Sequence, residues 1–254
     1  MGVQPPGSAI GKSGRTIALV TGAGRGIGAA IAKRLSLDGF TVALVDVDGQ
    51  AVEQTARALP QAHPFVCDVS DAQAVGELRT QVERQLGAPW LLVNAAGVFF
   101  LHRVPELDED GWDRTIDVNL KGPFLTCRAL LPNMVETKSG CIINVASTAG
   151  LRGGHDRAAY CASKAGLVMF TRSLALDHGA DGVRINCVCP GLIDTPMADW
   201  ITSRPQALEQ WRQGVPAQRI GVPDDIAGVV AFLASPAADY VHGAVMLVDG
   251  GVSA

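Results

Sequence analysis

Short apolar runs recur along the chain and are separated by longer stretches of mixed polarity. Most of the runs are continuously apolar rather than alternating, which is typical of strands buried on both faces of a parallel sheet. The pattern predicts about seven such strands, at Ile17–Val20, Val42–Val45, Phe65–Cys67, Leu91–Val93, Cys141–Ile143, Ile185–Val188 and Val245–Val248.

The stretches between these runs have helical periodicity. The first predicts a helix that ends at Asp38-Gly39, from apolar residues at Ile27, Ala30, Ile31 and Leu35. Similar patterns predict helical stretches over residues 71–86, 108–135 and 158–177. Alternating strands and helices imply right-handed crossovers with helices on both faces of the sheet. We therefore expect a doubly wound, Rossmann-type α/β fold.

Composition narrows the class of protein. The 254 residues are 48% hydrophobic and 18% charged, which is enough apolar material for one large core. We expect a single domain over residues 15–254, after a flexible tail at 1–14 that is rich in Gly, Pro and Ser. A net charge of −4 without a basic cluster argues against nucleic acid as a partner, and no apolar run approaches the ~18 residues of a membrane span.

The six cysteines are spread through apolar segments, which is typical of small buried residues in a reducing compartment. The N-terminal residues also lack the apolar core of a secretory signal. We expect a cytoplasmic protein that does not act at a membrane.

A glycine-rich turn, Thr21 to Gly28, follows the first predicted strand and leads directly into a helix. Glycines at such a turn let the backbone approach a pyrophosphate at the helix N-terminus. The spacing fits two dinucleotide-binding patterns, Gly24-x-Gly26-x-x-Ala29 and Gly22-x-x-x-Gly26-x-Gly28. Asp46 ends the next strand 18 residues after Gly28, where a carboxylate can accept hydrogen bonds from a ribose. Dinucleotide binding is favoured over a plain tight turn, and the chain has no P-loop motif for phosphoryl transfer.

Tyr160 and Lys164 place a phenol and an ammonium group on one face of a predicted helix. A nearby cation lowers the pKa of a tyrosine, which starts near roughly 10, toward the range useful for proton transfer. The same pattern is also common as an exposed helix pair. Ser147 favours the catalytic interpretation, because it follows the strand at 141–145 and precedes Tyr160 by 13 residues.

Together these motifs resemble the short-chain dehydrogenase/reductase family, in its single-domain branch, from about Arg15 to Gly251. The matching segments are Thr21–Gly28, Asn94–Gly97, Asn119 within Asp117–Leu120, Ser147, the Tyr160/Lys164 pair, and Pro190-Gly191 with Thr195. The resemblance implies an oxidoreductase that transfers a hydride between a nicotinamide cofactor and a secondary alcohol or ketone of small to medium size. It also implies a homotetramer, assembled through the helices at 108–135 and 158–177 and through the C-terminal strand region.

The resemblance assigns roles to four catalytic residues. Tyr160 exchanges a proton with the substrate oxygen, and Ser147 hydrogen-bonds that oxygen. Lys164 holds the nicotinamide ribose and lowers the pKa of the tyrosine, and Asn119 supports a water-linked proton path. Asp68 and Val69 are expected to contact the adenine, and Asn94 the adjoining ribose. The other expected cofactor contacts are Gly22, Arg25, Gly26, Ile27, Gly28, Asp46, Ala95, Gly97, Pro190, Gly191, Ile193 and Thr195.

The sequence predicts the substrate pocket in less detail than the cofactor site. The segment 195–214 has the amphipathic pattern of a lid over the nicotinamide, although a surface helix pair would show the same pattern. We expect Met197 and Trp200 to line the substrate pocket, and His155 either to join them or to lie solvated in its loop. The tryptophans suit an apolar or alicyclic substrate, whereas a long acyl-carrier substrate would favour more cations than Arg204, Arg212 and Arg219.

Three alternatives to this interpretation bear on function. A 3-oxoacyl-thioester reductase would use the same catalytic residues. A non-catalytic dinucleotide-binding module would not need an ionisable phenol beside Ser147 and Lys164. Metal ligation at Cys187 and Cys189 is disfavoured because a structural zinc site needs about four ligands, so we expect no metal.

Cofactor choice depends on two residues of opposite charge. Arg25 could attract the 2′-phosphate of NADP, as a basic residue there does in some members of the family. Asp46 would repel that phosphate and bind the free ribose hydroxyls of NAD. Because Asp46 is short and fixed at a strand end, we expect NAD to be preferred over NADP.

Overall fold

The computed structural model describes residues 16–254, and the tail expected at 1–14 lies outside them. Within this range seven parallel strands form one sheet in the order β3-β2-β1-β4-β5-β6-β7. The strands are β1 (Ile17–Thr21), β2 (Thr41–Asp46), β3 (Ala62–Val66), β4 (Leu91–Asn94), β5 (Gly140–Val145), β6 (Val183–Pro190) and β7 (Val245–Val248). Every predicted strand is present, so the predicted parallel sheet is confirmed.

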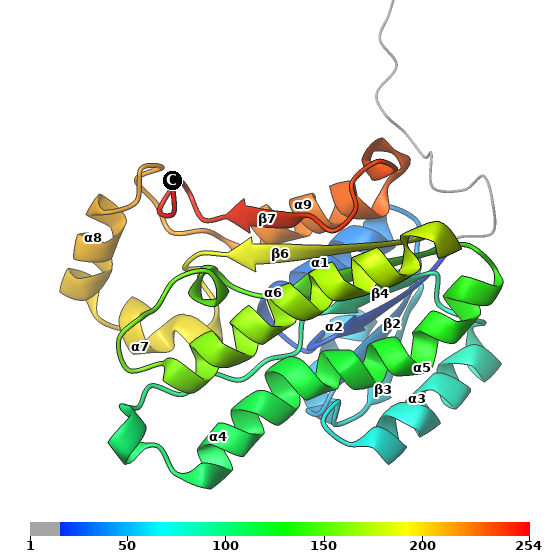
Figure 1. The fold of residues 1–254 in the computed structure, drawn as a ribbon, viewed down its shortest axis with the longest axis horizontal. Coiled ribbons are helices and arrows are strands. Elements are labelled where there is room, and N and C mark those ends of the chain that lie inside the picture. The colour runs from blue at the N-terminus through cyan, green and yellow to red at the C-terminus, as the bar shows by residue number, and fades with distance from the viewer. Residues whose placement is uncertain (1–15) are drawn as a thin grey trace, which may run out of the picture.

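Helices cover both faces of the sheet (Figure 1). They are α1 (Gly26–Leu37), α2 (Gly49–Arg57), α3 (Ala72–Gln85), α4 (Glu109–Ile116), α5 (Gly122–Glu136), α6 (Ala158–His178), α7 (Asp199–Thr202), α8 (Pro205–Gln213) and α9 (Pro223–Ala234). One face packs against α1, α2 and α9, and the other against α3, α5 and α6. The fold is therefore doubly wound, as predicted. No helix within residues 16–254 combines the length and the apolar character needed to cross a membrane.

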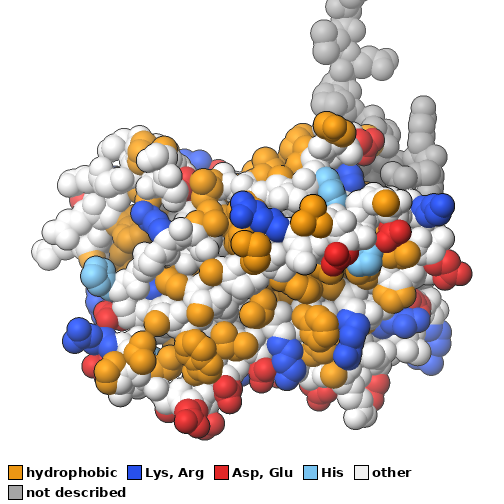
Figure 2. All heavy atoms as spheres, viewed as in Figure 1, with side chains coloured by type: hydrophobic (Ala, Val, Ile, Leu, Met, Phe, Trp, Pro, Cys, Tyr) orange, Lys and Arg blue, Asp and Glu red, His pale blue; other side chains and the backbone are white. Residues whose placement is uncertain are grey.

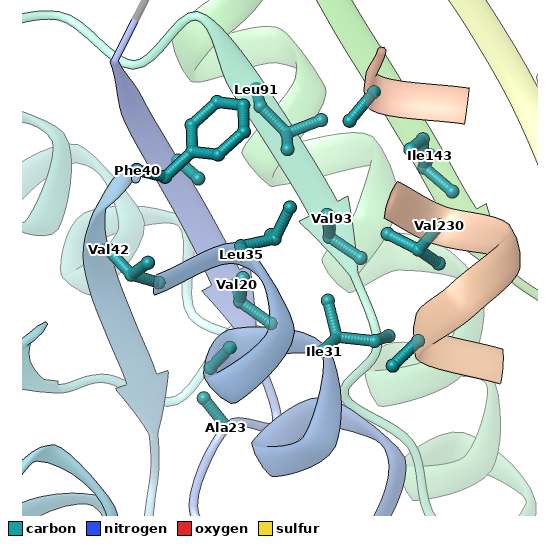
Figure 3. Packing of buried hydrophobic residues seen from close by; sticks show 14 of the residues in the cluster. Val20, Ala23, Ile31, Leu35, Phe40, Val42, Leu91, Val93, Ile143 and Val230 are labelled. Atoms are coloured by element: carbon teal, nitrogen blue, oxygen red, sulfur yellow. The ribbon is translucent and has the colours of Figure 1, made fainter. Parts of the chain in front are cut away.

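A dense apolar core fixes the helix that follows the glycine-rich turn (Figure 3). Ile31 and Leu35 of α1 are buried against Val20 of β1 and Val93 of β4, and Val230 of α9 closes the cluster. Burial of such side chains contributes about 1.5–3 kcal/mol each. The start of α1 is thus held rigidly at the carboxyl ends of β1 and β4, where the strand order reverses and ligands bind in such sheets.

The helix expected over 108–135 is interrupted. It consists of α4, a π-helical turn at Asp117–Lys121, and α5. A π turn inserts an extra residue into the helical ladder and is frequent at functional sites. The sequence pattern was interpreted as one continuous helix and did not reveal this insertion.

Two helices were not predicted from the pattern. The α2 helix is short, although Asp48 caps its N-terminus by accepting a hydrogen bond from Ala51 N–H (3.1 Å). The α9 helix is almost uniformly apolar after its first turn, so it lacks the alternation of an amphipathic helix. Pro223 at its start, followed by Asp224 and Asp225 in its first turn, is the signal that could have identified it.

Candidate active site

The turn between β1 and α1 has a backbone that only one of the two glycine patterns explains. Gly22 and Gly26 have φ of +67° and +56°, which favour glycine. A Cβ on Gly28 would lie 2.1 Å from the carbonyl oxygen of Gly22. Gly24 has no positive φ, although a Cβ on it would lie 2.9 Å from Asp46 Oδ2. The pattern Gly22-x-x-x-Gly26-x-Gly28 therefore accounts for the positive φ values of the turn, and Gly24 makes room for the Asp46 carboxylate.

A cavity of about 460 Å³ opens at the carboxyl ends of β1, β2 and β4. No side chain caps the N-terminus of α1, so its first N–H groups are available to an anionic group. A Cβ on Gly22 would lie 2.8 Å from the backbone of Ala96, so the turn makes a cradle that only glycine allows. These features fit a dinucleotide. The expected cofactor residues that line the cavity are Gly22, Arg25, Gly26, Ile27, Gly28, Asp46, Asp68, Val69, Ala95, Gly97 and Thr195.

Asp46 and Arg25 are both engaged within the protein. The Asp46 carboxylate accepts hydrogen bonds from Gly24 N–H (2.9 Å) and Asp48 N–H (3.0 Å), which hold it at the edge of the cavity. Arg25 forms an ion pair with Asp48 (2.6 Å). The guanidinium thus already has a carboxylate partner that the sequence did not reveal.

Asp68 also has a partner in the cavity. Burial alone would raise the pKa of Asp68, but hydrogen bonds from Ser70 and Arg114 outweigh it and hold the pKa below its ordinary value. The Arg114–Asp68 ion pair spans 3.0 Å and joins α4 to the end of β3. Asp68 therefore lies ionised beside Val69 in the cavity wall.

The Asn94 side chain does not face the cavity. It is 3% exposed, donates to Asn144 Oδ1 (2.9 Å) and accepts from Thr126 Oγ1 (2.7 Å). The expected contact between Asn94 and a ribose would therefore fall to its backbone. Three other expected cofactor residues, Pro190, Gly191 and Ile193, line a second cavity next to the first.

Ser147, Tyr160 and Lys164 come together as the sequence predicts. Ser147 follows β5, and Tyr160 and Lys164 lie one turn apart in α6. Ser147 acts on the Tyr160 phenol as a hydrogen-bonding group that lowers its pKa, and both side chains line the second cavity. Lys164 is 4% exposed, and its Nζ donates to the carbonyl oxygen of Val145 (2.9 Å).

The expectation that Lys164 lowers the pKa of Tyr160 is wrong for this structure. Burial raises the pKa of the phenol to about 12, although Ser147 and Arg157 both act to lower it. Burial also lowers the pKa of Lys164 to about 8. Both shifts have the same physical cause, since desolvation disfavours the charged form of either group. The phenol is therefore protonated at neutral pH.

Asn119 lies in the π-helical turn and is fully buried. Its side chain accepts from Val98 N–H (2.8 Å) and donates to the Val98 carbonyl (3.0 Å) and to Ser163 Oγ (3.1 Å). This amide holds the loop after β4 against α6. The side chain thus positions the wall of the first cavity and does not reach into it.

The second cavity, of about 300 Å³, contains the expected substrate residues His155, Met197 and Trp200. Among its other lining residues, Phe99, Arg152 and Arg157 were not singled out from the sequence, whereas Trp211 belongs to the segment expected as a lid. The direction of a loop side chain is not readable from periodicity, although Arg152 and Arg157 flank His155 in the segment before Tyr160. The segment 195–214 supplies Met197, Trp200 and Trp211 to this wall, so the region expected as a lid borders the cavity.

The thiols of Cys187 and Cys189 lie on one face of β6, with their Sγ atoms 4.0 Å apart. Their mutual hydrogen bond and burial raise the pKa of Cys187. Among residues 16–254, no three His, Cys, Asp or Glu side chains are grouped so that they could hold a metal ion.

Comparisons with known proteins agree with this site. A profile of the family described as enoyl-(acyl carrier protein) reductase matches residues 22–253. The chain is 40% identical over 242 residues to meso-2,3-butanediol dehydrogenase of Serratia marcescens, covering 94% of each chain. It is 34% identical to a 3-oxoacyl-[acyl-carrier-protein] reductase of Chlamydia trachomatis, covering 93% of this chain and 96% of the relative.

A solved structure titled as a putative gluconate dehydrogenase from Agrobacterium tumefaciens superposes with a TM-score of 0.90 at 32% identity, over 94% of this chain and 96% of that one. These relatives are named as dehydrogenases and reductases, and they match nearly the whole of this chain. The matched region includes the sheet, the glycine turn and the Ser147, Tyr160 and Lys164 residues. The chain belongs to the short-chain dehydrogenase/reductase family, whose members are oxidoreductases that act on CH–OH groups and bind nicotinamide cofactors.

Proposed function

We propose that this enzyme interconverts a small secondary alcohol and its ketone, with NAD as the preferred cofactor. The observation that carries the proposal is that Ser147 and Tyr160 line one wall of a cavity adjoining the cofactor cavity. Ile27, Phe99, Thr195 and Met197 line both cavities, so a substrate and a cofactor would share this wall. Relatives named as butanediol and threitol dehydrogenases support the alcohol class.

The residues divide the chemistry between them. A bound nicotinamide cofactor supplies or accepts the hydride. Tyr160 gives its proton to the carbonyl oxygen during reduction and accepts the hydroxyl proton during oxidation. Ser147 donates a hydrogen bond to the same oxygen and keeps it beside the phenol. Gly22, Gly26 and Gly28 would admit the pyrophosphate, and Asp46 would bind the adenosine ribose.

The protonation states support reduction at neutral pH. A phenol with a pKa of about 12 is ready to donate a proton, and oxidation requires that it first lose one. Lys164, with a pKa of about 8, is mostly cationic at pH 7. Its contact with the nicotinamide ribose and the water-linked path at Asn119 remain predictions.

The preference for NAD rests on the carboxylates around the adenosine end. Two like unit charges 4 Å apart cost about 4 kcal/mol at an effective dielectric of 20, and solvent reduces this. The 2′-phosphate of NADP would approach Asp46, and Arg25 is already paired with Asp48 (2.6 Å). The second carboxylate thus weakens the pull of Arg25 on the 2′-phosphate of NADP.

A 3-oxoacyl-thioester reductase is the alternative, because some relatives carry that name. The cations near the lid do not favour it. Arg212 pairs with Glu209 (2.9 Å) and Arg219 with Asp225 (2.6 Å), and neither lines the substrate cavity. A cavity of about 300 Å³ is at the small end of the roughly 300–1,000 Å³ range of small-molecule sites.

A homotetramer and a cytoplasmic location belong to the same proposal. Hydrophobic side chains gather on the face over α5 and α6 (Figure 2), where Met169 and Leu176 are 60% and 88% exposed. Apolar groups exposed on two adjacent helices suit an interface with a second copy of the chain. Light scattering at micromolar concentration should give the mass of four chains, and the mass of one chain would contradict this part of the proposal.

The function is tested with a panel of secondary alcohols, ketones and 3-oxoacyl thioesters, each assayed with NAD(H) and NADP(H) by absorbance. Small alcohols or ketones should be turned over with a higher kcat/KM than the thioesters. A panel on which only the thioesters react would establish the alternative. The absence of turnover with every member would contradict the proposed substrate class.

A further inference from the structure

The substrate cavity has an unbalanced set of charges. Arg152, His155 and Arg157 are among its lining residues, and this lining, all of it within the described chain, contains no Asp or Glu. Neither Arg152 nor Arg157 has an ion-pair partner among residues 16–254. A cavity with cations and no carboxylate focuses a positive potential on whatever enters it.

Arg157 is held firmly in this wall. Its guanidinium carbon lies 5.8 Å from the ring centroid of Phe99 and 5.4 Å from that of Trp200, and its Nε donates to the carbonyl oxygen of His155 (3.1 Å). A Cβ on Gly154 would lie 2.7 Å from its Cδ. Stacking and this hydrogen bond fix the cation, and its terminal N–H groups have no hydrogen-bond partner among residues 16–254, which suits bidentate binding of an anion.

The cation lies next to the reacting groups. Phe99, on which Arg157 stacks, also packs edge-on against Tyr160 with ring centroids 4.9 Å apart. Arg157 also acts electrostatically on the phenol. Asp156, the adjacent acid in the chain, faces Arg103 instead, at 3.9 Å. A substrate whose oxygen meets Tyr160 would therefore have a fixed positive charge within the same small cavity.

We infer that the substrate of this enzyme carries an anionic group, a carboxylate or a sulfonate, close to the carbon that is oxidised or reduced, and that Arg157 and Arg152 bind it. The substrate class is then a short hydroxy acid or hydroxy sulfonate and its oxo form. This inference rests on the proposed function, and it replaces the purely apolar or alicyclic substrate that the tryptophans suggested from sequence.

The test compares ligands of matched shape and different charge. Acetoacetate, 2-oxopropane-1-sulfonate and neutral acetoacetamide are titrated against the enzyme with NAD, which cannot reduce them. The change in tryptophan fluorescence, to which Trp200 and Trp211 of the cavity wall contribute, reports binding without turnover. We expect at least one anion to bind about tenfold or more tightly than the amide, because hydrogen bonds to charged groups are worth that much. Comparison of the affinities for acetoacetate and 2-oxopropane-1-sulfonate shows whether the site prefers a carboxylate or a sulfonate.

Variants then assign the preference to residues. Arg157→Gln should reduce the ratio of anion to amide affinity by about tenfold, and Arg152→Gln should reduce it less, because Arg152 is exposed. Arg204→Gln makes the same charge change at an exposed residue outside the cavity and should leave the ratio intact. Arg157→Lys should restore part of the ratio if charge matters more than stacking.

Equal binding of anions and amide by the wild-type enzyme would overturn the inference, as would a preference that survives both Arg157→Gln and Arg152→Gln. A second assay, turnover of the same ketones with NADH, tests the proposed function independently of anion binding. Reduction of acetoacetamide without any preference for the anions would overturn the inference alone. Selective binding of anions without reduction of any ketone in the panel would support the inference and contradict the function.

Discussion

In the cofactor cavity each lining arginine has a carboxylate partner: Arg25 pairs with Asp48, and Arg114 with Asp68. In the adjoining substrate cavity, Arg152 and Arg157 line the wall and no carboxylate does. The first arrangement suits a cofactor whose adenosine ribose needs hydrogen-bond acceptors and whose pyrophosphate is bound by backbone N–H groups. The second suits a substrate that brings its own negative charge. Charge pairing, rather than the number of basic residues, distinguishes the two ends of the site.

The largest expected effect lies where the two cavities meet. Tyr160→Phe should lower kcat by about 10²–10⁴-fold, because only the hydroxyl that transfers the proton is removed. Cofactor binding and substrate binding should both persist, since the ring still packs against Phe99. Steady-state rates with equilibrium binding of each ligand measure this. Near-normal turnover by the folded variant would remove Tyr160 from its assigned role.

Lys164 is a buried cation whose partner is a carbonyl oxygen rather than a carboxylate. Burial lowers its folded-state pKa to about 8 from 10.5. Between these values the unfolded chain holds a proton that the native state has lost, so the wild-type free energy of unfolding gains from rising pH. Lys164→Met cannot show this gain. Its stability relative to wild type should therefore fall by on the order of 2 kcal/mol between pH 7 and 10.

Urea unfolding at fixed protein concentration measures this difference at both pH values. Lys33→Met, at an exposed residue of α1, is the matched control and should give the same difference at pH 7 and 10. A gap between Lys164→Met and wild type that does not change with pH would show that the buried ammonium is not destabilising at pH 7.

Cofactor preference tests the role of charge pairing in the cofactor cavity. The wild type should prefer NAD, and Asp46→Ser should raise the kcat/KM with NADP relative to NAD by about tenfold, equivalent to about 1.4 kcal/mol. Asp48→Ser should have a smaller effect in the same direction, because it frees Arg25 while serine can still cap α2. Both ratios are measured on one substrate. A wild-type preference for NADP would show that Arg25 dominates despite its partner.

The smallest expected effect is at Gly154, whose added Cβ would press on the flexible Arg157 side chain rather than on backbone. Gly154→Ala should shift the guanidinium and lower the ratio of anion to amide affinity by a few fold. Cofactor affinity should stay unchanged, because Gly154 does not line that cavity. Fluorescence titration of both ligands gives the two values. A loss of cofactor affinity equal to the loss of anion preference would show that the two ends are not separate.

The two ends also differ in how well the sequence predicts them. The strands and the glycine turn are determined by local rules, since buried strands read as apolar runs and positive φ requires glycine. The positions of Ser147, Tyr160 and Lys164 follow from one strand end and one helix face. Partners such as Asp48 depend on where two loops meet in space. The pKa of Tyr160 likewise depends on the folded structure. The spacing of Tyr160 and Lys164 predicted a lowered pKa, whereas burial raises it.

The substrate cavity was the least predictable region because its wall comes from loops and short helices. Arg157 owes its direction to Phe99 and Trp200, which lie 58 and 43 residues away in the chain. No periodicity relates such positions. The π-helical turn that places Asn119 is a similar case, because the sequence pattern predicted one continuous helix over this region.

The wall common to both cavities has a consequence for redesign of the enzyme. Ile27, Phe99, Thr195 and Met197 contact both compartments, so a substitution at any of them would change the affinity for two ligands at once. A library aimed at new substrates would lose cofactor affinity in many of its members if it varied these positions. His155 and Trp211 border the substrate compartment without lining the other one. They are among the positions at which substrate selectivity can be changed independently of cofactor affinity.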